Sequence, residues 1–156
     1  MKFNWKLLAV CLGIPLAVGG LSALITRSAM EDFKALDQPP LAPPGWLFPV
    51  VWTILYLLMG WSLYLVLTSG SGNTVTGQSV VLFGIQLLFN FLWSIFFFNL
   101  KLYYFSFGWL IVLWALIFAM ATSFYRASRL AALLNIPYLI WVAFAGYLNI
   151  GIAILN

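Results

Sequence analysis

Five long apolar stretches, none of which contains a charged residue, divide this chain. They are residues 7–26, 47–68, 79–100, 103–124 and 130–155. An α-helix rises about 1.5 Å per residue, so roughly 20 residues cross a hydrocarbon core that is ~30 Å thick. The pattern therefore predicts an all-α membrane protein, built as a single domain of five transmembrane helices.

The composition supports this interpretation. Charged residues make up 6% and apolar residues 65% of the 156 residues, whereas a soluble domain carries about 25% charged residues. The expected surrounding is therefore the lipid bilayer. The net charge of +4 comes from basic residues scattered at helix ends, so we do not expect nucleic-acid binding, which needs a clustered basic face.

The basic residues in the connections predict the orientation of the spans. Those on the N-terminal side are Lys2, Lys6, Arg126 and Arg129. Those on the other side are Arg27, Lys34 and Lys101. Because basic residues favour the cytoplasmic side of a membrane, this slight excess predicts a cytoplasmic N-terminus.

The first connection, residues 27–46, differs from the others in length and composition. It contains all three acidic residues and two proline pairs, Pro39-Pro40 and Pro43-Pro44. Proline fixes φ and favours extended geometry at the preceding residue, so we expect residues 39–44 to form a stiff strap. A long connection in a compact domain is more often functional than accidental, and we expect a lid rather than a spacer. We interpret residues 69–78 as a flexible polar turn without a function.

Small residues recur at every fourth position of the first span, at Ala9, Gly13 and Ala17, with a second pair at Gly19 and Ala23. This spacing lets two helix backbones approach closely. We expect it to serve packing within the chain; the alternative is a seam between two copies.

Several kinds of chemistry are excluded by what the sequence lacks. It has no histidine, and no carboxylate, lysine or arginine lies within a span. Ion-coupled transport normally needs such a group at depth, and a hydrolase needs a base beside its nucleophile. Cys11 is the single cysteine, so neither a disulfide within the chain nor a cysteine metal site is expected. We expect no metal and no resident cofactor.

Aromatic and amide side chains remain, and they form stripes at helical spacing. The second span carries Trp52 and Tyr56, the third Gln86, Asn90 and Trp93, and the fifth Trp141, Ala145, Leu148 and Asn149. An unpaired amide is costly in hydrocarbon, so these amides should face the interior of the bundle. They can join helices by hydrogen bonds, or they can line a ligand cavity together with the tryptophans.

Three stretches carrying these stripes resemble one family. Residues Pro39–Gly60, Gln86–Ser94 and Asn135–Asn149 follow in order and are similar to the signatures of the translocator protein family. This family is also known as the tryptophan-rich sensory proteins, TspO, or the peripheral benzodiazepine receptor. The similarity extends over nearly the whole chain.

The resemblance implies a five-helix bundle, usually a homodimer, with an aromatic cavity beneath the first loop. That cavity would bind protoporphyrin IX, haem, and drugs of the benzodiazepine and isoquinoline-carboxamide types. The residues implied to contact ligand are Trp52, Asn90 and Trp141, with Ala145 and Leu148 as neighbours. Tyr147 is followed by no basic residue, so the cholesterol motif of animal members is incomplete, which fits a member from a bacterial cell membrane.

The resemblance thus implies a membrane receptor or sensor for tetrapyrroles. One alternative is an enzyme that degrades porphyrin with light and oxygen, in which Trp52 and Trp141 would be the catalytic redox partners. Another is a transporter for porphyrins or similar amphiphiles. The residues alone do not choose among the three.

Overall fold

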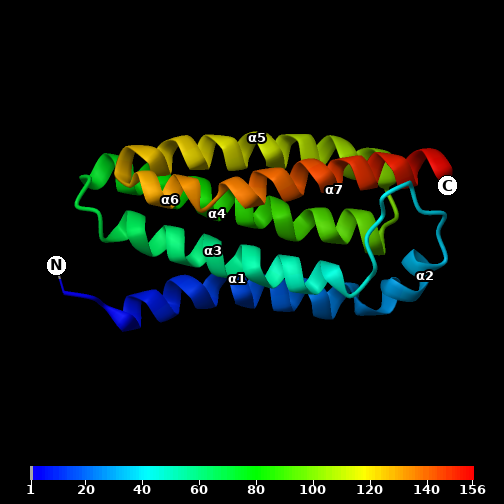
Figure 1. Cartoon of the computed structure of the whole chain (residues 1–156), viewed down its shortest axis with the longest axis horizontal. Helices are drawn as coiled ribbons and strands as arrows, with labels where there is room; N and C mark the ends of the chain where they lie inside the picture. The colour runs from blue at the N-terminus through cyan, green and yellow to red at the C-terminus, as the bar shows by residue number, and fades with distance from the viewer. Residues whose placement is uncertain (1) are drawn as a thin grey trace.

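The computed structural model describes residues 2–156, which form an elongated bundle of helices without a β-strand (Figure 1). Five of its helical segments are long and apolar enough to span a membrane, so the predicted fold class is confirmed. In chain order the elements are α1 (Trp5–Thr26), the 3-10 turn η1 (Arg27–Ala29), α2 (Met30–Lys34), α3 (Leu47–Leu67), α4 (Asn73–Ser94), the π-helical turn η2 (Ile95–Asn99), α5 (Tyr103–Ala127), α6 (Arg129–Leu133) and α7 (Ile136–Leu155).

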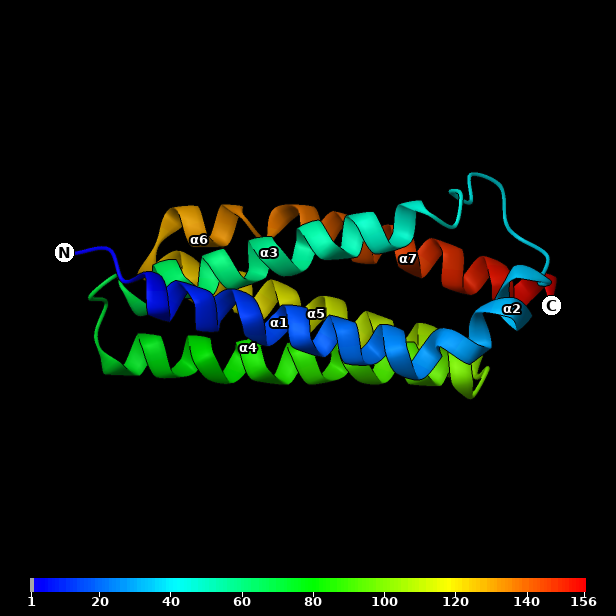
Figure 2. The same ribbon diagram turned by 90° about the horizontal axis from the view of Figure 1, so that it is seen from below.

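The helices are arranged as a ring. Closely packed neighbours are α1 with α3, α3 with α6, α6 and α7 with α5, α5 with α4, and α4 with α1. The short link at residues 100–102 joins α4 and η2 to their antiparallel neighbour α5. By contrast, α3 and α7 have few close backbone approaches. The N-terminus lies at one end of the bundle, and α2, the first connection and the C-terminus lie at the other (Figures 1 and 2).

Two connections are shorter than predicted. Residues 27–34 are helical, because η1 and α2 follow α1 without a gap in the chain, and only residues 35–46 are irregular. Glu31 and Asp32 occupy the first turn of α2, where acidic side chains complement the helix dipole. The expected polar turn at 69–78 is also mostly helix, because α4 begins at Asn73, directly after Gly72 with φ 91°.

The last span is not one continuous helix. A break at residues 134–135 separates α6 from α7, and Pro137 lies in the first turn of α7. Proline has no backbone N–H to continue a helix but fits at a helix start. The break positions Asn135, whose side-chain amide donates to the Ser62 hydroxyl at 3.1 Å and joins this corner to α3.

Close packing of α1 on α3 depends on a glycine in α3 rather than on the predicted stripe in α1. A Cβ atom placed on Gly60 would lie 2.5 Å from the Cys11 carbonyl oxygen, so only glycine permits this approach. Ala9, Gly13 and Ala17 are exposed instead, so our expectation of packing within the chain was wrong for these three. Gly19 of the second pair does pack within the chain, against the Tyr56 ring. Spacing alone does not reveal which face of a helix is turned inward.

We predict that Gly60→Ala destabilises the bundle by about 1–3 kcal/mol, because the added methyl group collides with backbone that cannot rotate away. Gly84→Ala is the matched control, since a Cβ atom there meets nothing within 4 Å. Unfolding of the purified protein in detergent measures both. Equal stability of the two variants would contradict the close approach of α1 and α3.

Candidate functional site

The centre of the bundle is held by one chain of buried hydrogen bonds. The Tyr138 hydroxyl donates to the Gln86 side-chain oxygen at 2.7 Å and accepts from the Asn90 side-chain nitrogen at 2.7 Å. The Asn90 oxygen in turn accepts from the Tyr56 hydroxyl at 3.2 Å. The chain ends where the Gln86 nitrogen lies 4.0 Å from the Met59 sulfur. It thereby links α3, α4 and α7.

These contacts use much of the hydrogen-bonding capacity of the two amides. Gln86 and Asn90 are 0% and 1% exposed. An amide buried at this depth in a membrane protein would be costly without hydrogen bonds, and the polar atoms of both side chains have partners. Their observed contacts are therefore hydrogen bonds that join helices, the first of the two roles considered for these amides. Tyr138, which the sequence stripes omitted, is the side chain on which the network converges.

A second polar link joins α4, α7 and α5. The Trp93 indole donates to the Asn149 side-chain oxygen at 3.0 Å, and the Asn149 nitrogen donates to the Tyr103 carbonyl at 2.8 Å. Ala145 and Leu148, predicted as neighbours of the site, are buried on the same helix. Trp93 and Asn149 thus form a group of their own, separate from the network around Tyr138.

Aromatic rings bridge the seam between α3 and α7, where the backbones stay apart. The Trp52 ring lies 6.3 Å from that of Tyr138, and the Phe48 ring lies 5.9 Å from that of Trp141, both edge to face. From Phe48 to Trp52 the residue number rises along α3, whereas from Trp141 to Tyr138 it falls along α7, as expected for two antiparallel helices. Trp52 also stacks on Tyr56 at 5.7 Å.

Tyr56 is in turn held in place by a glycine. A Cβ atom on Gly19 of α1 would lie 2.3 Å from the Tyr56 ring, so the absent side chain leaves room for the phenol. This contact fixes one end of the aromatic series and of the hydrogen-bond chain together.

Two buried side-chain polar atoms have no partner within the described residues, the Asn135 side-chain oxygen at the break before α7 and the Trp141 indole nitrogen. The Trp141 ring contacts Phe48 of α3 and, at 5.5 Å, Phe144 of α7. An unpaired buried donor costs about 1–3 kcal/mol, and such groups in native proteins call for an explanation.

The first connection folds back along the C-terminal half of α7. The Asp37 backbone N–H donates to the Asn156 side chain at 3.1 Å, and the Tyr147 hydroxyl donates to the Pro40 carbonyl. Between these contacts, Pro39 is buried against the bare backbone of Gly151, where a Cβ atom would lie only 2.6 Å from the proline ring.

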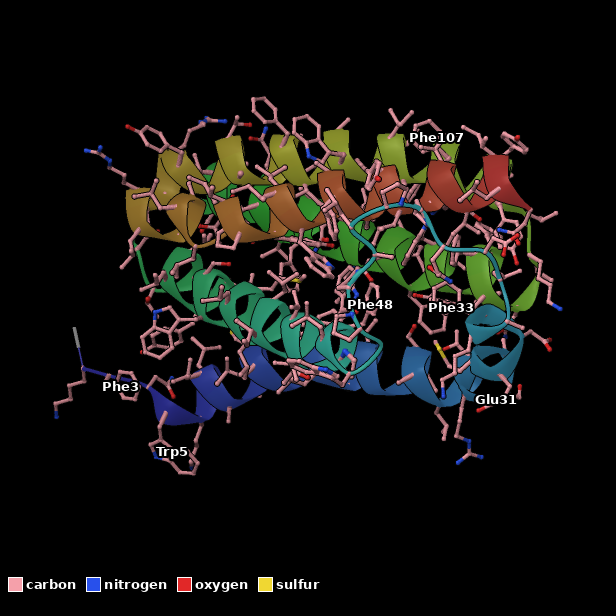
Figure 3. All side chains as sticks on the ribbon, turned by 45° about the vertical axis from the view of Figure 1, so that its right-hand side comes forward. Phe3, Trp5, Glu31, Phe33, Phe48 and Phe107 are labelled. Carbon is pink, nitrogen blue, oxygen red and sulfur yellow. The ribbon has the colours of Figure 1, made fainter. Side chains whose placement is uncertain are left out.

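The rest of the strap then crosses from α7 to the start of α3, close to Phe48 (Figure 3). Pro43 is half-buried, whereas Pro40 and Pro44 are exposed. A turn closes at the Pro39 carbonyl, which accepts from the Ala42 N–H at 3.3 Å, with Leu41 at φ 69°. Proline at the second position presets this turn, and the expected stiffness has a structural basis.

An ion pair ties the strap end of α1 and α2 to the link between α4 and α5. The Lys101 ammonium lies 2.9 Å from an Asp32 carboxylate oxygen. The hydrogen bond to Asp32, with the attraction of its charge, raises the pKa of Lys101 above its ordinary value. Both side chains are exposed, so we assign the pair a positioning role only.

The sequence-predicted residues therefore fall into three groups. Trp52, Tyr56, Gln86 and Asn90 converge through Tyr138; Trp93 pairs with Asn149; and Trp141 lies against Phe48 near the strap. The sequence reasoning missed Phe48 and Tyr138. Phe48 lies one turn before Trp52, and Tyr138 lies one turn before Trp141. Extending each stripe by one turn toward the start of its helix would have found both.

Two cavities lie away from these residues. One of about 680 Å³ lies between α4 and α5, and one of about 420 Å³ lies between α5 and α7. Within residues 2–156, no group of three or more histidine, cysteine, aspartate or glutamate side chains could hold a metal ion. What the interior offers is therefore ring faces, hydroxyls and amides.

This is a five-helix integral membrane protein whose interior is built from aromatic and amide side chains, with its first connection folded over the last helix. The chain belongs to the TspO/MBR family, whose model matches residues 11–155. The resemblance seen in the sequence is thereby confirmed.

Relatives share this length and are found in distant organisms. The chain is 42% identical to "Tryptophan-rich protein TspO" of Chlorobaculum tepidum, over 96% of this chain and 95% of the relative. It is 36% identical to the protein of the same name from Archaeoglobus fulgidus, over 97% of each. It is 33% identical to "Translocator protein" of Bos taurus, over 87% of this chain and 82% of the relative.

We predict that Tyr138→Phe destabilises the protein by about 1–3 kcal/mol, because it leaves the Gln86 oxygen and the Asn90 nitrogen without their partner. Tyr125→Phe is the matched control on an exposed surface. Thermal unfolding in detergent compares the two. A Tyr138 variant as stable as the control would show that the network contributes little.

Proposed function

We propose that this protein is a membrane receptor for tetrapyrroles such as protoporphyrin IX and haem, which it takes up between α3 and α7 beneath the strap. The observation that carries the proposal is the seam itself. Its helix backbones stay apart, its gap is bridged by Phe48, Trp52, Tyr138 and Trp141, and the strap passes from one helix to the other.

Physical chemistry favours a flat, largely apolar ligand there. Indole and phenol rings stack on extended aromatic systems with about 0.5–1.5 kcal/mol beyond their area burial. The unpaired Trp141 N–H supplies a donor for a carboxylate or carbonyl of the ligand. Benzodiazepine-type and isoquinoline-carboxamide drugs share the combination of fused rings and a carbonyl. The seam offers mainly aromatic ring faces and edges, so we expect ring contacts to dominate recognition.

We further propose that the protein resides in a bacterial cell membrane with its N-terminus in the cytoplasm. Four basic residues lie toward the N-terminal end of the bundle and three toward the strap end. Basic residues favour the cytoplasmic side. Accessibility of single introduced cysteines to a membrane-impermeant reagent tests this orientation.

Titration with protoporphyrin IX in the dark tests the receptor proposal, with tryptophan fluorescence and porphyrin absorbance as readouts. Saturable quenching with a shift of the porphyrin absorbance band is expected. Failure to quench at micromolar ligand would overturn the proposal. Repeating the titration under light separates a receptor from an enzyme, because an enzyme would convert the porphyrin to a defined product and would lose this activity when Trp52 and Trp141 are replaced by Phe.

We predict that Trp141→Phe weakens porphyrin binding roughly three- to tenfold, the value of one hydrogen bond. The ligand-free bundle should lose little stability, because the deleted N–H has no partner to abandon.

Trp93→Phe is the matched comparison with the opposite expectation. It removes a donor that is in use and leaves the Asn149 oxygen unpaired, so it should lower thermal stability more than affinity. If both variants affected binding and stability in the same proportion, the Trp141 N–H would have no role in recognition.

We predict that Gly151→Leu weakens porphyrin binding roughly five- to tenfold, because the new side chain displaces Pro39 and a preorganised cover is lost. Gly108→Leu is the control, since a Cβ atom there meets nothing within 4 Å. Dissociation constants and unfolding temperatures are measured for both. If the strap were only a brace, Gly151→Leu would lower the unfolding temperature and the affinity for porphyrin together.

A further inference from the structure

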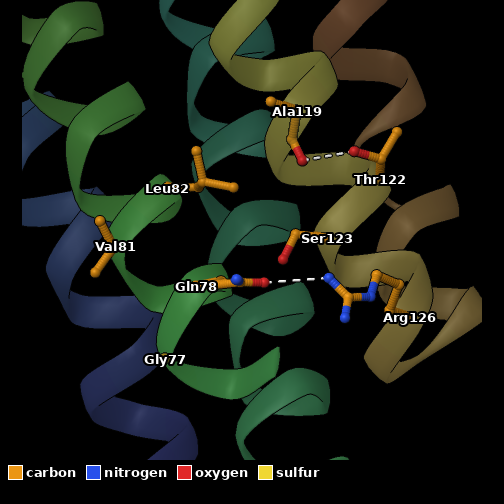
Figure 4. A pocket seen from close by; sticks show the side chains of 8 residues that line it. All are labelled: Gly77, Gln78, Val81, Leu82, Ala119, Thr122, Ser123 and Arg126. Atoms are coloured by element: carbon orange, nitrogen blue, oxygen red, sulfur yellow. Dashed lines mark hydrogen bonds between the residues drawn. The ribbon is translucent and has the colours of Figure 1, made fainter. Parts of the chain in front are cut away.

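The largest cavity described above lies outside the seam between α3 and α7. It is a groove between the first turns of α4 and the last turns of α5, with a volume of about 680 Å³ (Figure 4). These turns lie at the end of the bundle opposite the strap (Figure 1). The groove therefore needs an account of its own.

The groove has one polar end and an apolar course. Arg126 and Gln78 lie nearer the ends of the two helices, while Val81, Leu82 and Ala119 line the part nearer their middle. The Arg126 guanidinium donates to the Gln78 side-chain oxygen at 3.1 Å. Below them, a buried hydrogen bond between Ser79 and Ser123 at 2.8 Å holds the two helices together.

The cation in this groove faces no acidic partner. The ion pairs within residues 2–156 are Lys34 with Glu31 and Lys101 with Asp32, both at the strap end. The third acid, Asp37, lies in the first connection, just before the strap. Arg126 therefore offers its guanidinium, which has five N–H donors in a fork that matches phosphate, to a neutral amide alone.

We propose that this groove is a binding site for an anionic phospholipid. The headgroup phosphate would bind Arg126 and Gln78, and the upper part of one acyl chain would lie along Val81, Leu82 and Ala119. Basic pockets between transmembrane helices at a membrane surface recognise anionic headgroups in this way. The assignment is independent of the tetrapyrrole site.

The form of the groove favours a lipid over a free anion. From Ala119 to Arg126 the groove follows α5 for about 10 Å, at ~1.5 Å per residue. Its walls there combine Val81, Leu82 and Ala119 with the small side chains of Thr122 and Ser123, and it is open to the outside of the bundle. A soluble phosphate could use only the Arg126 end. A phospholipid uses both the charge and the apolar walls.

Native mass spectrometry of the purified protein, titrated with phosphatidylglycerol or with phosphatidylcholine of the same acyl chains, tests the proposal. We expect phosphatidylglycerol to bind more tightly. Arg126→Gln should weaken its binding about fivefold or more, as for a basic residue at an anionic membrane surface. Arg129→Gln is the matched control, because Arg129 is exposed at the same end but does not line the groove.

A second pair of variants tests the acyl-chain part without changing charge. Gly77 lines the groove and Gly84 does not, and a Cβ atom at either meets nothing within 4 Å. Gly77→Phe should fill the groove and weaken both lipids, whereas Gly84→Phe should weaken neither.

Three results would overturn the site. They are equal binding of the two lipids, equal losses in the Arg126 and Arg129 variants, and competition by free glycerol phosphate at the concentrations at which the intact lipid binds. The last would make the groove an anion site rather than a lipid site.

Discussion

The fold depends on one constraint: a polar group inside hydrocarbon must find its partner within the protein. The Tyr138 hydroxyl of α7 meets it for two amides of α4 at once, accepting from Asn90 and donating to Gln86. Because hydrogen bonds in series polarise one another, the chain from Tyr56 to Gln86 acts as a unit. It sets the rotation of α3, α4 and α7 about their axes, and the aromatic rings of the seam follow from that rotation.

The same constraint divides the aromatic and amide residues by role. Residues whose polar atoms are all engaged, such as Trp93 with Asn149, stabilise the bundle. Trp141 retains an indole N–H without a partner, and Trp52 meets its neighbours through ring faces and edges. A family rich in tryptophan can therefore use one residue type both for structure and for recognition.

The sequence predicted the spans because membrane insertion depends on composition averaged over some 20 residues. It placed Gln86 and Asn90 inside because an amide in lipid is too costly. It failed where the local preferences for helix and for turn are nearly equal, as at Asn73, where α4 begins within the predicted polar turn. It failed again where the outcome depends on which face of a helix meets a neighbour, as for Gly13. The partner of each indole depends on side-chain geometry between helices, which no pattern along one helix contains.

The strap has a consequence for the rates at which a ligand would bind and dissociate. It is anchored on α7 by Asp37, Pro39 and Pro40, and covalently on α3. A ligand beneath it could enter or leave only after those α7 contacts release, unless it passes sideways from the lipid. Contacts that must break for both passages raise the barrier to arrival and to departure alike, in addition to any effect of the cover on affinity. Residence time in such a site would thus be adjustable at Gly151 and Tyr147, residues that need not touch the ligand.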